Sequence, residues 1–132
     1  MDCNDTNWPL AIAVAEGPVT PSGLRQFLIQ WGLWLDRASP FVLLRIFTCD
    51  EAVASFDAMQ AELQAWTQAN DERIRNLVLG IATTVPERCL ERSTEAEHML
   101  GIPARTFTSS LTAVSWLQNS ILAPAGLSVD SL

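Results

Sequence analysis

The chain has 132 residues, of which 48% are hydrophobic, and a formal net charge of −7. This length fits one domain with one core, and the composition is that of a globular protein. All eight basic residues are arginines, and the overall negative field repels nucleic-acid backbones and anionic membrane surfaces. Neither nucleic acid nor a membrane surface is therefore expected as a partner.

The first apolar run, Leu10 to Val14, predicts a short strand. A helix is expected next, because Thr20 can cap it and Pro21 suits its first position. The helix should end near Arg37, because Ser39-Pro40 cannot continue it.

This first helix has apolar side chains on more than one side. At about 100° per residue, one stripe can face the core and consists of Leu24, Phe27, Leu28, Trp31 and Leu35. Ile29 and Leu33 lie on the opposite side among polar residues, and Trp34 lies on the flank. A helix that is apolar beyond one stripe is buried twice or meets a partner. We therefore expect Ile29, Leu33 and Trp34 at or near an interface.

The second strand is predicted at Phe41 to Phe47, a nearly continuous apolar run typical of a strand covered on both faces. Thr48 and Glu51 then match a capping box, with Thr48 as the cap of a second helix. The apolar spacing predicts a single one-faced helix that ends in the polar residues 68–73 and buries Ala52, Phe56, Met59, Leu63 and Trp66.

Further elements follow in alternation. A third strand is expected within Ile74 to Val85, a polar helix at Arg88 to Leu100 and a short strand at Ala104 to Thr108. The last helix begins at Ser109 or Ser110 and has an apolar stripe of Leu111, Val114, Leu117 and Ile121. Trp116 points away from this stripe and is a second candidate interface anchor.

Strands that alternate with helices predict an α/β fold with a mostly parallel sheet of four to five strands. Residues 1–132 should form one domain with an ordered core at about 9–122, between a flexible N-terminus and a loose C-terminal tail. No apolar run approaches the roughly 20 residues of a membrane helix. The acidic start of the chain is unlike a secretory signal, so we expect a cytoplasmic protein without membrane insertion.

The three cysteines, Cys3, Cys49 and Cys89, are odd in number and far apart. No CxxC or Cys/His spacing is present, which argues against a disulfide framework and a zinc site. Free structural thiols are therefore expected, with a reactive Cys49 near a helix start as the alternative. We assign no metal and no cofactor.

Several stretches together resemble a known group of folds. They are Val19-Thr20-Pro21 before a helix, Arg73-Ile74-Arg75 leading into Leu77 to Ile81, Ala104 to Thr108, and Ala113 to Leu117 with its Ala-x-x-Trp-Leu element. This order, over roughly residues 9 to 122, resembles small bacterial proteins of the STAS type, the fold of anti-sigma-factor antagonists, and the related SEC14-like group. The resemblance implies a STAS-like sheet and a regulatory role without catalysis.

One turn departs from the STAS pattern. STAS regulators have a phosphorylated Ser or Thr after a central strand, within an Asp-Ser-x-Gly-like turn. The matching turn here, Thr48 to Glu51, has neither Ser nor Gly, and its two carboxylates would repel a phosphate. The chain also lacks an obvious second N-terminal strand, which many STAS domains have. A kinase-driven switch at Thr48 is therefore disfavoured.

Ligands of parallel sheets bind at the carboxyl ends of the strands, where Thr48 and Asp50 are found here. Arg45 interrupts an apolar strand. It either directs its guanidinium at an anionic ligand or a partner carboxylate, or it snorkels from an edge strand or pairs with an internal acid. Thr48 and Asp50 are either ligand or switch residues, or ordinary helix-start residues. His98, the only histidine, has no identifiable catalytic partner, so no catalytic residue is assigned.

The sequence favours a non-enzymatic regulatory or scaffolding domain that acts through protein association. Self-association as a homo-oligomer, most simply a dimer, is included in this interpretation. The alternative is a small-molecule or lipid-binding module with a pocket between the sheet and the first helix. An enzyme that completes its site across a dimer is a third class.

Overall fold

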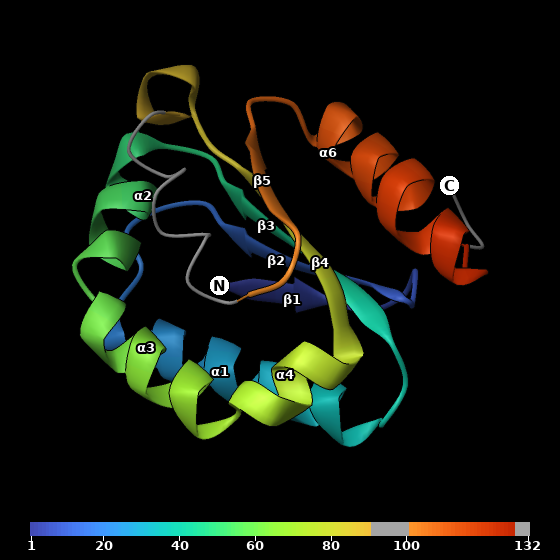
Figure 1. Ribbon diagram of the computed structural model, residues 1–132. Coiled ribbons are helices and arrows are strands. Elements are labelled where there is room, and N and C mark those ends of the chain that lie inside the picture. Colours follow the sequence, from blue (N-terminus) through green and yellow to red (C-terminus); the bar gives the residue numbers. More distant parts are fainter. Residues whose placement is uncertain (91–100, 129–132) are drawn as a thin grey trace.

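The computed structural model describes residues 1–90 and 101–128 and centres on a five-stranded sheet in the order β1-β2-β3-β4-β5 (Figure 1). Strands β2 to β5 are parallel, and β1 is antiparallel to β2. The strands are β1 (Asp2–Asn4), β2 (Leu10–Ala15), β3 (Phe41–Phe47), β4 (Val78–Thr84) and β5 (Ala104–Phe107). The predicted α/β class with a mostly parallel sheet is confirmed.

The helices lie on both faces of this sheet. They are α1 (Pro21–Asp36), α2 (Asp50–Asp57), α3 (Gln60–Ala69), α4 (Asp71–Leu77) and α6 (Ser110–Trp116). Helix α6 continues into a π-helical segment, η3 (Leu117–Leu122), and short 3₁₀ segments lie at η1 (Glu87–Cys89) and η4 (Ala123–Ala125). Each parallel connection moves to the next strand in the same direction, so right-handed crossovers place α1 to α4 on one face. Helix α6 covers the other face (Figure 1).

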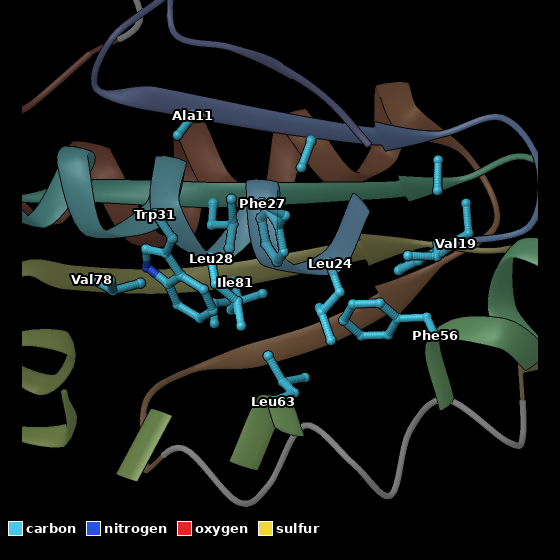
Figure 2. Packing of buried hydrophobic residues seen from close by; sticks show 14 of the residues in the cluster. Ala11, Val19, Leu24, Phe27, Leu28, Trp31, Phe56, Leu63, Val78 and Ile81 are labelled. Atoms are coloured by element: carbon cyan, nitrogen blue, oxygen red, sulfur yellow. The ribbon is translucent and has the colours of Figure 1, made fainter. Parts of the chain in front are cut away.

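Helix α1 packs on the sheet through the stripe that the sequence predicts. Its five side chains are at most 5% exposed, and Figure 2 shows Leu24, Phe27, Leu28 and Trp31 among residues of the sheet and of α2 and α3. Strand β2 presents only small side chains to this cluster, which leaves room for the rings of α1: Ala11, Ala13 and Ala15.

The opposite face of the sheet is covered by α6 and η3. Their buried side chains meet Leu10, Val42, Leu44 and Ala82 in a second apolar cluster. Gly80 of β4 permits this approach, because a Cβ there would lie only 3.1 Å from the Ile121 side chain.

The N-terminus differs from the prediction. Asp2 and Asn4 pair with Val14 and Ile12, so β1 forms an edge strand where a flexible segment and no second N-terminal strand were expected. Met1 and Cys3 pack against the α1 side of the core. The strand was missed because its polar sequence has no apolar alternation, and main-chain pairing with β2 holds it in the sheet.

The segment after β3 also differs. The predicted single helix is two helices, because the chain turns at Ala58 and Met59 between α2 and α3. The third strand, expected within Ile74 to Val85, begins only at Val78, because Leu77 is the last residue of α4, in which Ile74 is 1% exposed. Neither Gly nor Pro marks the turn, so the continuous apolar spacing concealed it.

The C-terminal elements follow the prediction in part. Strand β5 and the start of α6 after Ser109 are confirmed. The predicted helix Arg88 to Leu100 begins in η1, and residues 91–100, including His98, lie outside the described residues. Within residues 1–90 and 101–128, no helix has both the length and the apolarity needed to cross a membrane.

All three cysteines are free thiols. Burial raises the pKa of the Cys3 thiol, and Cys89 is only 3% exposed. We expect alkylation of unfolded, unreduced protein to label three cysteines by mass spectrometry, and alkylation of the folded protein to be slowest at Cys89. An intramolecular disulfide would contradict this result.

Candidate functional site

The most unusual surface lies on α1, on the side away from the sheet. Ile29 is 66% exposed and Leu33, one turn later, is 54% exposed. Around them lie the exposed side chains of Arg25, Gln26 and Asp36. We call these five residues the outer face of α1. Two adjacent aliphatic side chains in water are a feature of surfaces that meet a partner.

Local sequence fixes the start of this helix. The Thr20 Oγ1 accepts a hydrogen bond from the Gly23 backbone N–H at 3.0 Å, and Pro21 is the first helical residue. The predicted cap is therefore confirmed. The buried stripe is held by the sheet, so the opposite side of α1 points to solvent at Ile29 and Leu33.

One aromatic residue borders the outer face. Gly32 faces Trp66 of α3, since a Cβ on this glycine would lie 3.9 Å from the indole. Trp66 is half-buried and packs on Trp31 with ring centroids 5.0 Å apart. The sequence placed Trp66 in the core stripe and did not connect it with the surface of α1, because helix-to-helix contacts are not visible in local spacing.

Charges lie at the two ends of the outer face. Arg25 is near the start of α1, and Asp36 is its last residue. The Asp36 Oδ1 accepts a hydrogen bond from Arg73 of α4. Arg25 forms no ion pair within the part of the chain that the structure describes. Along this face, a basic side chain therefore lies at one end, aliphatic side chains in the middle and an ion-paired acidic side chain at the other end.

Trp34 is not part of this surface. It is 1% exposed, and its Nε1–H donates to the Asp5 Oδ2 at 3.2 Å. The same carboxylate oxygen pairs with Arg37 at 2.6 Å, and the Arg37 guanidinium lies 4.1 Å from the centre of the Trp8 ring. The N-terminal turn covers Trp34, so its predicted role as an interface anchor is wrong.

Trp116 lies on the opposite face of the sheet from α1, on helix α6. It is half-buried, 5.7 Å from the Phe107 ring, and the Arg105 guanidinium lies 5.8 Å from its ring centre. These residues line an open hollow of about 470 Å³ beside Leu111, which is 85% exposed. The sequence placed Leu111 in the apolar stripe of the last helix, which its exposure shows to be wrong, and it did not single out Arg105. The interface role of Trp116 stays a prediction.

Arg45 is directed into a polar row across three strands. Its Nε and Nη2 donate to the Thr83 Oγ1 at 3.1 and 2.7 Å, and its guanidinium lies 5.6 Å from the Phe56 ring centre. Thr83 is a residue of β4 and lies between Arg45 of β3 and Thr106 of β5. Contacts within the chain therefore hold the guanidinium. Because β3 is the central strand, the edge-strand alternative for Arg45 is wrong, and a pair with an internal acid stays a prediction.

Thr48 and Asp50 are held by other parts of the chain. The Thr48 Oγ1 donates to the Ala15 carbonyl at 3.2 Å, and Cys49, not Thr48, precedes α2 as its cap residue. The predicted capping role of Thr48 is wrong, because β2 supplies an acceptor for its hydroxyl. Asp50 accepts hydrogen bonds from Arg88 and from the Cys89 thiol, the latter at 3.4 Å.

The space between α1 and the sheet is filled by side chains. Phe27 and Trp31 are 0% and 1% exposed within it, and Figure 2 shows them beside Val78 and Ile81. In residues 1–90 and 101–128, no three His, Cys, Asp or Glu side chains gather in a way that could hold a metal ion.

Comparisons with known proteins add no assignment, since no family model, curated protein or solved structure matches the chain. The candidate site therefore rests on the geometry of the chain itself.

Proposed function

We propose that this protein is a non-enzymatic association domain that binds a protein partner, including a second copy of itself, through the outer face of α1. The observation that carries the proposal is the exposure of Ile29 and Leu33 at 66% and 54% on a helix whose other stripe is fully packed. Burial of apolar surface stabilises a complex by about 25 cal/mol per Å². Covering these side chains therefore favours association.

The binding of a small molecule or lipid is the less favoured class. The pocket that this function requires between the sheet and α1 coincides with the packed rings of Phe27 and Trp31. The two candidate ligand residues also have partners within the chain. Arg45 donates to Thr83 of the sheet, and Asp50 accepts from Arg88 of η1.

A STAS-like or SEC14-like regulator in the cytoplasm is the finer form of the proposal. Its support is the sequence resemblance together with two features of the fold: a mostly parallel sheet, and an antiparallel N-terminal strand that the sequence had not revealed. In this form the protein acts as a regulatory or scaffolding subunit, with association as its mechanism.

A charge placed in the middle of the outer face tests the proposal. We expect Leu33→Glu to raise the dissociation constant for self-association at least tenfold, because a two-fold interface would bury the carboxylate twice. Analytical ultracentrifugation over a concentration series measures this change.

Leu111→Glu is the matched control. Leu111 is also an exposed leucine, at 85%, but it lies on α6 across the sheet. Association should therefore persist in this variant. If Leu111→Glu dissociates the oligomer and Leu33→Glu does not, the surface on α1 is the wrong one.

A further inference from the structure

We propose that two copies of this chain pair through α1 in antiparallel orientation, so that Arg25 of each copy meets Asp36 of the other. This inference rests on the proposed function and adds the occupant and its orientation. It follows from the order of charges and apolar residues along the outer face of α1.

The spacing along α1 suits a two-fold axis. Arg25 and Asp36 are about three helical turns apart, roughly 16 Å along the axis, and lie on the same side of the helix. The midpoint between them nearly coincides with the midpoint between Ile29 and Leu33. An axis at this point, perpendicular to α1, places Ile29 on the partner's Leu33 and Arg25 on the partner's Asp36.

The opposite orientation gives Arg25 no acid. If the two helices ran parallel, the two-fold axis would lie along them, and the edge with Arg25 and Asp36 would face the partner's edge with Gln26 and Arg37. Arg25 would then lie beside the partner's Gln26, and Asp36 beside the partner's Arg37, which already pairs with Asp5. Of the two orientations, the antiparallel pair is the one in which Arg25 meets a carboxylate, so the charge pattern favours it.

The second edge of the helix face adds no conflict. Gln26 and Arg37 lie there, and the same axis brings the uncharged Gln26 opposite Arg37. Arg37 is already paired with Asp5 at 2.6 Å within its own chain. No like charges of α1 therefore meet across the antiparallel interface.

Arg25 is an exposed arginine that can accept an acid from outside its own chain. Four other arginines of the described chain pair with an acid of the same chain, namely Arg37 with Asp5, Arg73 with Asp36, Arg75 with Asp71 and Arg88 with Asp50, whereas Arg105 lies over the Phe107 ring. Arg25 has no such pair within residues 1–90 and 101–128, although the chain has 15 acidic residues. Asp36 already pairs with Arg73 through Oδ1, so in the dimer its carboxylate is shared by two guanidinium groups, with the partner's Arg25 on the second oxygen.

Charge reversal tests the orientation. By ultracentrifugation of the full chain, we expect Arg25→Glu alone and Asp36→Arg alone each to raise the dimer dissociation constant about tenfold, because each reversal creates two repulsive contacts. The double variant Arg25→Glu/Asp36→Arg restores opposite charges at both contacts. Its dissociation constant should return to within about threefold of the wild type.

Matched controls come from the exposed Arg75–Asp71 pair on α4. Arg75→Glu and Asp71→Arg alter the net charge by the same amounts as the two test variants, and neither should change dimerisation. If the wild type dimerises through Leu33 but the single reversals at Arg25 and Asp36 behave like these controls, the antiparallel pairing is wrong while the proposed function stands. If the wild-type protein is monomeric, both the antiparallel pairing and the proposed self-association are wrong.

Discussion

Leu28→Glu is expected to unfold the domain, whereas the same change at Leu33 should leave it folded. Leu28 is 5% exposed in the cluster between α1 and the sheet, so a glutamate there would bury an unpaired carboxylate. We expect the free energy of unfolding to fall by about 4 kcal/mol or more, a large part of the 5–15 kcal/mol typical of a domain.

Urea unfolding followed by circular dichroism measures both variants. Leu33 is 54% exposed, so Leu33→Glu should change the free energy of unfolding by no more than about 0.5 kcal/mol. Low protein concentration is needed, because dissociation of an oligomer also lowers apparent stability. Equal loss of stability in the two variants would show that Leu33 is a core residue.

Trp34→Ala is the second change with a large expected effect. The indole is 1% exposed and is covered by the N-terminal turn, so its removal should leave a cavity and cost about 3–5 kcal/mol of stability. The melting temperature and the urea midpoint should both fall. If Trp34→Ala instead keeps wild-type stability but associates more weakly, Trp34 belongs to the interface.

Trp34→Phe separates packing from hydrogen bonding. Phenylalanine keeps much of the ring but loses the Nε1–H that donates to Asp5 at 3.2 Å. We expect a loss of roughly 1 kcal/mol for the hydrogen bond, with a further small loss for the reduced volume. Most of the effect of Trp34→Ala should therefore be absent in Trp34→Phe.

The first helix was predictable because its boundaries and its buried stripe are local features. Thr20 caps it, Pro21 starts it, and the spacing of three and four residues identifies the side that packs on the sheet. The exposure of Ile29 and Leu33 on the other side followed from the same geometry. Strands β2, β3 and β5 were similarly visible as apolar or short alternating runs.

Features that depend on distant residues were not predictable. The burial of Trp34 requires the turn at Asp5, and that turn is placed by β1, whose polar residues have no strand pattern of their own. The hydroxyl of Thr48 binds Ala15 of a neighbouring strand instead of capping α2. Partners that are distant in sequence decide each of these positions, so periodicity and capping rules place them incorrectly.

Sedimentation equilibrium of the wild-type protein tests the central claim that this chain self-associates. With increasing concentration, we expect the mean mass to rise reversibly from the 14.5 kDa of one chain towards twice that value. If the mean mass stays at 14.5 kDa up to a protein concentration of about 1 mM, the free energy of self-association is less favourable than about −4 kcal/mol. That result would contradict the account.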